Sequence, residues 1–520
     1  MGDLLDAYPA VLAWDEMFEK LGSARPPYQA LFEALQSLSA EDFLERCAVR
    51  DRALRDQGIT FSLSGVERPF PLDLVPRILS SSEWATVEAG VAQRVLALER
   101  FLADVYGRGE IFADGVVPRS VITSSAHFHR AAASIEPPNH VRVHVAGIDL
   151  VRDTGGRFRV LEDNIRTPSG VSYVVENRAT MVRVFPELFT SHRVRPVDDY
   201  PARLLEALWA SAPAGVDEPK VVVLTPGVFN PAYFEHTFLA RQMGVELVEG
   251  RDLVCRDGVV YMRTTEGEQR VDVVYRRVDD AFLDPLHFRP DSLVGCPGIL
   301  NAARAGRVTI ANAVGNGIAD DKLTYTYVPE MVRYYLGQEP LLPNVDTLRL
   351  EDADQRAWAL ERLGDLVFKP VDGSGGYGLV MGPTASDAEL ARLREVVEAS
   401  PRSWIAQPVI SLSTAPTYVG GRLEPRHLDL RPFAVNDGTK VWVAPGGLTR
   451  VALPAGSLVV NSSQGGGSKD TWVMAGGRAV PSPVTASRAG AAPVSPPPDP
   501  GPPDGAGAQQ QQQQQQQSRC

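Results

Sequence analysis

The sequence predicts a mixed α/β fold with α+β elements, built from several domains. Three observations support this class: apolar residues recur at three- and four-residue steps near the N-terminus, a strand–helix–strand pattern occupies the middle, and short strands alternate with helices after residue 311. The 520 residues, 44% hydrophobic and 22% charged, have the composition of a globular protein with room for about two to four domains.

Residues 1–115 are expected to form a helical N-terminal region. Helical spacing is clear in YQALFEALQSL (28–38) and in VEAGVAQRVLALERFLADVYG (87–107). This region shows no catalytic constellation. Residues 116–200 are expected to follow as a segment built around a hairpin.

A parallel α/β domain is predicted for residues 201–310. KVVVLTP (220–226) has the pattern of a buried strand, FEHTFLARQMG (234–244) that of a helix closed by glycine, and VELVEG (245–250) that of a second strand. VDVVYRRV (271–278) adds a further strand.

The last part of the chain changes character. Residues 311–475 alternate short strands with helices such as AELARLREVVEAS (388–400). Residues 476–520 are rich in Ala, Pro, Gly and Ser and include nine glutamines at 509–517. Such a segment cannot bury enough apolar surface to fold, so we expect a disordered tail.

The hairpin within IDLVRDTGGRFRVLEDNIRTPSG (148–170) brings two carboxylates together. If Gly155-Gly156 form a two-residue turn, Thr154 opposes Arg157 and Asp149 opposes Glu162. The period of a strand places Asn164 on the face of Glu162. Two carboxylates and an amide oxygen suit Mg²⁺. The same face is expected to continue with three apolar residues, Val151, Phe158 and Val160. The alternative is an ordinary exposed hairpin with charged ends.

A glycine-rich loop follows a strand in VFKPVDGSGGYGLVM (367–381). GSGGYG (373–378) matches G-x-G-x-x-G, but LVM indicates a returning strand where a dinucleotide-binding fingerprint needs a helix. The better interpretation is a hairpin whose backbone N–H groups cover phosphates, with Lys369 on the incoming strand. A surface turn with a solvated lysine is the alternative.

Further candidate phosphate ligands lie near the end of the folded part. Arg431 in HLDLRPF (427–433) and Arg450 in GGLTRVAL (446–453) have strand-like contexts. NSSQGGGSKDTW (461–472), which contains Lys469, can form an anion-binding nest. Each of these residues taken singly is more often a solvated surface residue.

Charge, cysteine content and targeting signals exclude several classes. A net charge of -12 and a pI near 5.3 argue against a nucleic-acid or anionic-membrane surface. The first twenty residues lack a basic segment followed by an apolar core, and no apolar run of about 18 residues occurs, so a cytoplasmic location is expected. Four scattered cysteines without CxxC support neither a disulfide framework nor a zinc site.

Together these motifs resemble a known enzyme family. The hairpin with E-x-N, the K-P-x-x-G-S-G-G-x-G loop, Ile405-Ala406-Gln407-Pro408 and DLRPF look like parts of an ATP-grasp enzyme. Their order is rearranged, because the metal-binding residues precede the glycine loop. The chain therefore resembles the circularly permuted type 2 ATP-grasp family, relatives of glutathionylspermidine synthetase, from about Trp14 to Trp472.

The resemblance implies a permuted ATP-grasp fold in which 116–200 carries the metal-binding hairpin, 201–310 is a pre-ATP-grasp-like domain and 311–475 binds the nucleotide. Asp149, Glu162 and Asn164 would hold Mg²⁺. The implied contacts to ATP are Lys322, Lys369, Ser374, Gly375, Gly376 and Gly378, with Gln407 at the adenine hinge. Pro408 stands where many hinges have glutamate, and it lacks a backbone N–H.

The implied activity is ATP-dependent ligation of a carboxylate to an amine through an acyl phosphate, with small-molecule or peptide substrates. Arg431, or Arg450, would stabilise the transferring phosphoryl group. Arg166, Arg277, Asn461, Ser462 and Lys469 are the candidates for substrate or intermediate binding. A phosphotransferase and a non-catalytic scaffold are the alternatives. Oligomeric state and the identity of the substrates are left open.

Overall fold

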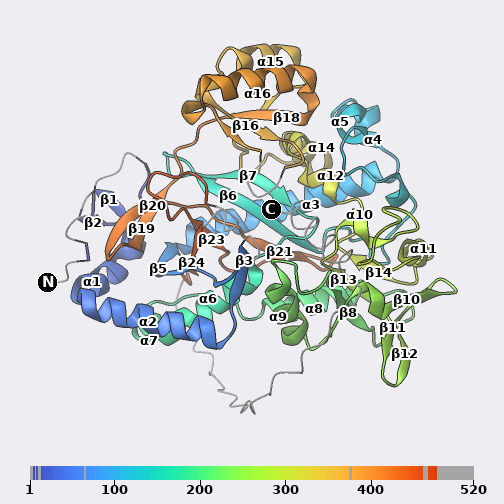
Figure 1. Ribbon diagram of the computed structural model, residues 1–520, viewed down its shortest axis with the longest axis horizontal. Coiled ribbons are helices and arrows are strands. Elements are labelled where there is room, and N and C mark those ends of the chain that lie inside the picture. The colour runs from blue at the N-terminus through green and yellow to red at the C-terminus, as the bar shows by residue number, and fades with distance from the viewer. Residues whose placement is uncertain are drawn as a thin grey trace.

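The structure is a computed structural model that describes residues 4–5, 8–9, 13–20, 22–63, 66–373, 378–460 and 466–476. Figure 1 shows a broad body of sheets and helices that carries a smaller α+β unit at one edge. The mixed α/β class predicted from the sequence is present. The predicted tail lies outside the described residues, apart from residue 476.

The N-terminal region contains strands as well as helices, which corrects the all-helical expectation for residues 1–115. Helices α2 (Ala40–Asp56) and α3 (Ser81–Val105) each begin with a serine capping box. Between them, β5 (Leu72–Leu79) is buried along its length and pairs in parallel with β24 (Gly467–Val473). Periodicity alone cannot separate a short, continuously apolar strand such as LDLVPRIL from a buried helix.

The central sheet joins segments that are far apart in the sequence. Its strand order is β22-β21-β6-β7, and every neighbouring pair is antiparallel. Strands β6 (Val145–Arg152) and β7 (Phe158–Asn164) form the predicted hairpin, and β21 (Phe433–Asn436) and β22 (Val441–Val443) extend the sheet on the β6 side. This sheet lies in the middle of the body in Figure 1.

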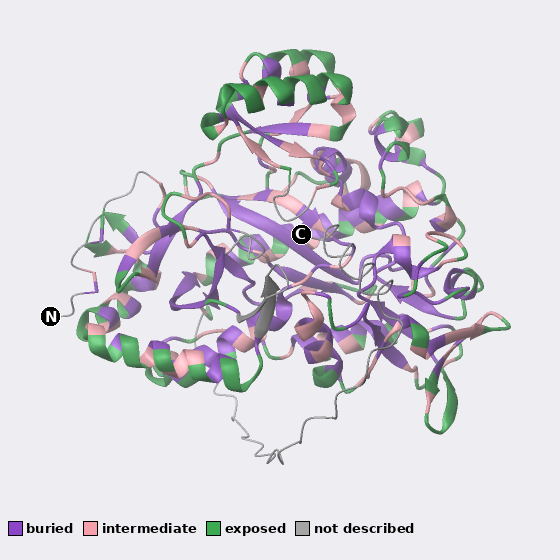
Figure 2. Ribbon diagram, viewed as in Figure 1, coloured by how far each residue is buried: buried purple, intermediate pink, exposed green. Residues whose placement is uncertain are grey.

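Alternate residues of β21 face two different helical layers. Ala434 belongs to the apolar cluster that contains one face of α3. Phe433 and Val435 belong to the cluster that contains α8 (Tyr200–Ala210). The two-residue period of the strand thus separates the two main cores. Figure 2 shows buried residues running through this sheet.

The parallel sheet expected between residues 201 and 310 is present, with strand order β14-β13-β8-β9. Helix α9 ends at Gly244, whose φ of +69° suits glycine at a helix C-terminus. An antiparallel three-stranded meander beside this sheet was not predicted. The elements of this part are β8 (Val221–Leu224), α9 (Tyr233–Met243), β9 (Glu246–Val248), β10 (Leu253–Arg256), β11 (Val259–Thr264), β12 (Gly267–Arg270), β13 (Val273–Arg276) and β14 (Thr309–Ala311).

The smaller unit is an antiparallel sheet, β15-β18-β16-β17, with two helices on one face (Figure 1). Phe368 and Ala406 pack against the helices in a separate apolar cluster, so their strand neighbours face the body. Its elements are β15 (Leu348–Arg349), α15 (Ala353–Leu360), β16 (Leu366–Pro370), β17 (Val380–Met381), α16 (Asp387–Ala399) and β18 (Trp404–Pro408). We call it the outer unit.

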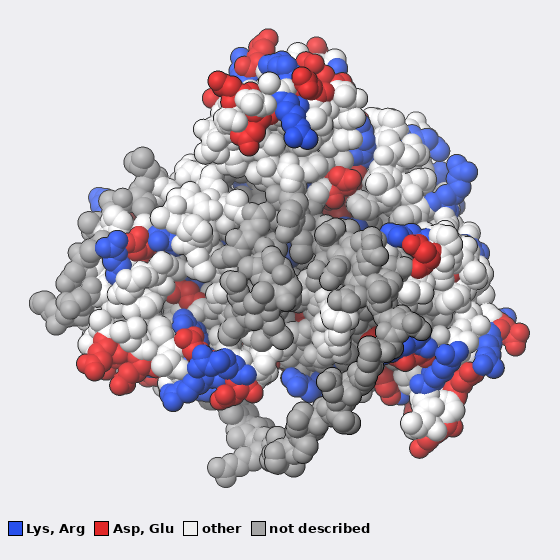
Figure 3. All heavy atoms as spheres, in the orientation of Figure 1, with Lys and Arg blue, Asp and Glu red and all other residues white. Residues whose placement is uncertain are grey.

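The outer faces of α15 and α16 are exposed in Figure 2, and they carry acidic and basic side chains together in Figure 3. In the described part of the chain no helix combines the length and apolar character needed to cross a membrane. The remaining helices are α1 (Gln29–Ser37), α4 (Glu110–Ala113), α5 (Arg119–Thr123), α6 (Val171–Val184), α7 (Pro186–Ser191), α10 (Asp280–Leu283), α11 (Ile299–Arg304), α12 (Gly317–Asp320), α13 (Lys322–Tyr325) and α14 (Val328–Leu336). The remaining strands are β1 (Phe18–Lys20), β2 (Ser23–Ala24), β3 (Thr60–Leu63), β4 (Val66–Pro69), β19 (Thr414–Val419), β20 (Arg422–His427) and β23 (Thr449–Val451).

Candidate functional site

The hairpin pairs Asp149 with Glu162 as predicted, but by a different route. Arg152 opposes Phe158, so the connection is a five-residue loop, 153–157, and not a two-residue turn at Gly155-Gly156. The register then shifts between Leu150 and Asp149. The unpaired residue of this bulge offsets the longer loop and restores the predicted pair.

The bulge also changes which apolar residues share the carboxylate face. Leu161 is the extra residue, and it lines a pocket together with Val151 and Glu162. Phe158 and Val160 pack instead in the main apolar cluster with α3. The expectation that they lie on the face of Val151 was therefore wrong, because one extra residue reverses the alternation of a strand.

Asp149 is fully buried between two arginines. Arg431 Nη2 donates to Asp149 Oδ2 at 2.7 Å, and Arg431 Nε donates to Oδ1. Arg450 Nη2 donates to the same Oδ2 at 2.6 Å. Burial opposes ionisation, but the two guanidinium groups hold the pKa of Asp149 well below its usual range.

Asp429 completes this charged cluster and was not predicted. Its carboxylate accepts from Arg450 Nε at 3.1 Å through both oxygens, and burial raises its pKa. The sequence contained a signal for it: in D-L-R the two-residue period places Asp429 on the strand face of Arg431.

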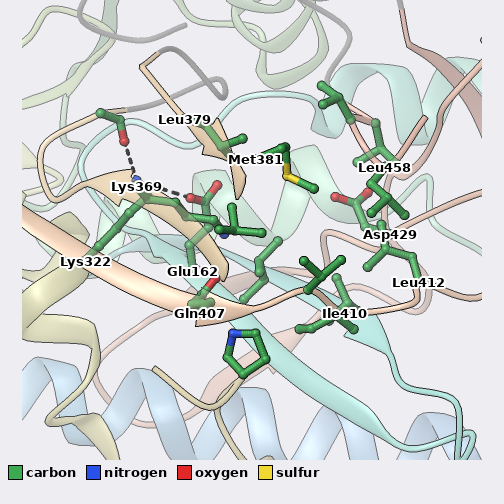
Figure 4. A pocket seen from close by; sticks show the side chains of 18 of the residues that line it. Glu162, Lys322, Lys369, Leu379, Met381, Gln407, Ile410, Leu412, Asp429 and Leu458 are labelled. Atoms are coloured by element: carbon green, nitrogen blue, oxygen red, sulfur yellow. Dashed lines mark hydrogen bonds and ion pairs between the residues drawn. The ribbon is translucent and has the colours of Figure 1, made fainter. Parts of the chain in front are cut away.

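Three charged side chains from different elements meet at one wall of the pocket. Lys322, at the start of α13, donates to the Gly373 carbonyl, and its Nζ lies 3.5 Å from Glu162 Oε2 (Figure 4). Lys369 lies on the body-facing side of β16 and lines the same pocket. Burial lowers the pKa of Lys369 to about 8, and nearby Glu162 partly offsets this effect.

The rest of the pocket is largely apolar. The outer unit contributes β16, β17 and β18, and the body contributes the hairpin and the chain on either side of β23. Figure 4 shows Met381, Leu412 and Leu458 gathered near Asp429, away from Lys322. A largely apolar pocket with a few convergent charged groups is the usual form of a small-molecule site.

Of the three residues predicted to bind magnesium, Glu162 lines this pocket, and Asp149 and Asn164 lie near it on the same hairpin. Among the described residues Glu162 forms ion pairs of 3.5 Å to Lys322 and 3.9 Å to Arg431 and lies beside Asp149, and its carboxylate oxygens are suitable ligands for a cation. Asn164 Nδ2 is buried and finds no hydrogen-bond partner among the described residues. These two side chains fit a hard cation, whereas both oxygens of Asp149 bind arginine here. Among described His, Cys, Asp and Glu residues, no group of three has metal-binding geometry.

Arg166 and Arg277 hold the loop after β7. Arg166 Nη1 lies 2.8 Å from Asp279 Oδ2, and its Nε lies 2.9 Å from Asp320 Oδ2. Arg277 Nη2 donates to Ser169 Oγ at 2.7 Å. Both guanidinium groups are buried, and their predicted contact with substrate stays a prediction.

Lys469 does not lie at the pocket. It is 1% exposed, pairs with Asp73 and donates to the carbonyls of Val75 and Pro416 at 3.0 and 2.7 Å. Its place in β24 beside β5 explains this, because the strand is buried throughout. Lys469 therefore forms a core ion pair and does not take part in the expected anion nest, of which residues 461–465 lie outside the described residues.

The remaining predicted residues fall into two groups. Gln407 lines the pocket, and Gly378 has a φ of +73° just before β17, which is the returning strand expected after the glycine loop. Five predicted contacts lie outside the described residues: Ser374, Gly375, Gly376, Asn461 and Ser462.

Comparison with known proteins identifies the family. The sequence model of the family described as "Circularly permuted ATP-grasp type 2" matches residues 76–452. An uncharacterized protein of Mycobacterium tuberculosis (strain ATCC 25618 / H37Rv) is 64% identical over 89% of this chain and 84% of its own length. An uncharacterized protein of Synechocystis sp. (strain ATCC 27184 / PCC 6803 / Kazusa) is 52% identical over 91% of this chain and 99% of its own.

A relative from Frankia casuarinae (strain DSM 45818 / CECT 9043 / HFP020203 / CcI3) bears the name "Putative glutamate--cysteine ligase 2-2". It is 47% identical over 90% of this chain, which spans 54% of that relative. A solved glutathione synthetase-like effector, GSS30 from Globodera pallida, superposes with a TM-score of 0.56 over 84% of this chain and 98% of its own at 12% identity, a likeness of fold alone. The family match covers well over half of the chain, so the chain belongs to the circularly permuted ATP-grasp type 2 family.

Proposed function

We propose that this member of the circularly permuted ATP-grasp type 2 family is an ADP-forming ligase that joins a carboxylate to an amine. The observation that carries the proposal is the meeting of Lys322, Lys369 and Glu162 beside an apolar pocket between the outer unit and the body. The apolar part suits a nucleotide base, and the lysines suit its phosphates.

The reaction has two steps. A carboxylate oxygen of the first substrate attacks the γ-phosphorus of ATP, the bond to the bridging oxygen breaks, and ADP leaves. The amine of the second substrate then attacks the acyl carbon, loses a proton and displaces inorganic phosphate, which leaves an amide.

The side chains of the pocket act by position and charge. Lys322 and Lys369 neutralise phosphate oxygens, and Arg431 stabilises charge on the transferring phosphoryl group. Glu162, Asn164 and Asp149 are the residues that would hold Mg²⁺, which would supply further neutralisation of phosphate charge. The outer unit shields the acyl phosphate from water.

The substrate class follows from the relatives only in outline. The Frankia protein named as a glutamate–cysteine ligase supports an amino acid or short peptide as substrate. Because this chain spans about half of that protein, the named activity can reside in the other half, and we do not assign glutamate and cysteine to this chain.

The test is ATP turnover by the purified chain with Mg²⁺ against a pool of amino acids, peptides and amines, with the products followed by mass spectrometry. We expect ADP together with an adduct that has lost one water, and neither product with Glu162→Gln. ADP with a product heavier by one phosphate would identify a phosphotransferase instead. No nucleotide binding by the wild type would leave the non-catalytic scaffold.

A further inference from the structure

Gln407 is the uncharged polar side chain among the described residues that line the pocket. It lies on β18 opposite Val367 of β16, two residues along that strand from Lys369. At a strand rise of about 3.3 Å per residue, this places Gln407 roughly 7 Å along the sheet from the lysine. It faces the body together with Val367 and Lys369, because the alternate residues Phe368 and Ala406 pack under the outer helices.

A neighbouring threonine determines which end of the Gln407 amide faces the pocket. Gln407 Nε2 donates to Thr347 Oγ1 at 2.9 Å. Thr347 Oγ1 in turn donates to the Val345 carbonyl at 2.8 Å, which uses its only hydrogen. The hydroxyl is therefore an acceptor toward Gln407, and the amide must present nitrogen to Thr347.

These two hydrogen bonds, from Gln407 to Thr347 and from Thr347 to the Val345 carbonyl, form a relay that disfavours the reversed amide. It would place Gln407 Oε1 against a hydroxyl oxygen whose hydrogen is already used. Tyr325 offers no substitute donor, because its hydroxyl donates to the Val160 carbonyl at 2.6 Å. Reversal thus costs about one hydrogen bond, which corresponds to roughly a tenfold change in an equilibrium constant.

Because Nε2 of the Gln407 amide binds Thr347, Oε1 is the amide atom available to a ligand. No described residue donates a hydrogen bond to Oε1. A carbonyl-type acceptor in an apolar slot accepts from the exocyclic amino group of adenine and opposes the carbonyl oxygen that guanine carries at the same ring position. Pro408, the next residue, lacks the backbone N–H that could serve guanine instead.

We infer that Gln407, positioned by Thr347, makes this pocket select adenine over guanine nucleotides. The inference rests on the proposed function in that the pocket is taken as the nucleotide site. It goes beyond that proposal by assigning base selection to the Val345–Thr347–Gln407 relay, in which Thr347 is a positioning residue that does not itself touch the base.

The experiment measures the dissociation constants of ADP and GDP with Mg²⁺ by titration calorimetry on the full chain. We expect the wild type to prefer ADP by about tenfold or more. Thr347→Val removes the relay without changing side-chain volume much, and the preference should fall to about threefold or less. Thr347→Ser keeps the hydroxyl and should keep the preference, and Gln407→Met, which removes the acceptor, should abolish it.

Thermal unfolding identifies any variant that fails to fold. If Thr347→Val does not fold, Gln407→Met provides the test. Equal binding of ADP and GDP by the wild type, or an unchanged ratio in both Thr347→Val and Gln407→Met, overturns the inference. The titrations contain nucleotide but no carboxylate or amine substrate, so they measure base selection separately from ligation. Either result can therefore be positive while the other is negative. Absence of binding by either nucleotide overturns both proposals.

Discussion

At the scale of single residues, the two carboxylates of the hairpin differ in what holds them. Asp149 is fully buried between Arg431 and Arg450, whereas Glu162 is partly exposed and forms longer ion pairs. Asp149 therefore compensates two guanidinium groups directly, while Glu162 offsets the charge of Lys322 and of buried Lys369 at longer range.

Exchange of each carboxylate for its amide should separate these roles. Asp149→Asn leaves two buried guanidinium groups with less compensation and should lower the free energy of unfolding by about 3 kcal/mol or more. Glu162→Gln removes only longer ion pairs, so it should lower the free energy of unfolding by less than Asp149→Asn does and still abolish turnover. Urea denaturation followed by circular dichroism measures both. Equal destabilisation of the two variants would contradict the roles assigned here.

Lys369 should make nucleotide binding depend on pH. Its pKa is lowered to about 8 by burial, so it begins to lose its charge just above neutral pH. Phosphate favours the charged form, so binding takes up a proton above pH 8 and affinity should fall by up to about tenfold per pH unit there.

Near pH 7 and below, Lys369 is almost fully charged because its pKa is about 8, and its contribution to affinity should be constant there. Titration calorimetry with ADP between pH 7 and about 9.5 measures this slope. Lys369→Arg keeps its charge across that range and should flatten the profile. The same slope in both proteins would show that another group titrates.

At the scale of elements, the hairpin shows what a sequence pattern can and cannot determine. The pairing of Asp149 with Glu162 was predicted, because both strands are clear and the glycines mark a turn. The five-residue loop and the bulge at Leu161 were not, because loop length and bulge position depend on packing against both cores. The longer loop shifts the strand register by one residue and the bulge shifts it back by one, so the two carboxylates still face each other.

Residues that are distant in sequence account for the other differences. Lys469 was misplaced because its partner, Asp73, lies almost four hundred residues earlier in the chain. Asp429 was missed although the D-L-R pattern places it on the face of Arg431, because its role depends on Arg450, which also binds the distant Asp149. The short apolar strand β5 was missed because its partner, β24, lies almost four hundred residues later. Local patterns carry no information about such pairings.

Strand β24 should mark the boundary between the required chain and the dispensable tail. It pairs with both β5 and β23, and Trp472 within it is fully buried. A chain that ends after residue 476 should keep the melting temperature of the full chain. One that ends before Gly467 loses the strand that joins the two others and should fail to fold cooperatively.

Differential scanning calorimetry of the two truncated chains tests this boundary. Trp472→Ala in the full chain offers a milder version and should cost about 3–5 kcal/mol. A cooperative transition at the same temperature without β24 would contradict the arrangement described here.

At the scale of the whole molecule, the outer unit and the body meet around the pocket. Arg402, just before β18, donates to Ser124 Oγ at 2.8 Å and lies 2.7 Å from Asp321 Oδ2. Asp321 also caps the helix that begins with Lys322. Asp321 thus contacts the outer unit and caps the helix that begins with Lys322, a proposed phosphate ligand.

The permuted order of the chain fits this arrangement. Asp149 of the hairpin lies 282 residues before Arg431 and 301 residues before Arg450, and the segments meet because β21 pairs with β6. The family resemblance predicted the order of the parts, and the structure supplies the register that brings Asp149, Arg431 and Arg450 together.

The central claim is that the protein activates a carboxylate by transferring phosphate to it. The most direct test supplies the substrate pool with oxygen-18 in its carboxylates and follows the inorganic phosphate formed from ATP by mass spectrometry. Attack by a carboxylate oxygen predicts that each phosphate released on amide formation carries one oxygen-18 atom. Amide formed together with unlabelled phosphate would contradict the account. A phosphorylated product without amide would contradict it as well.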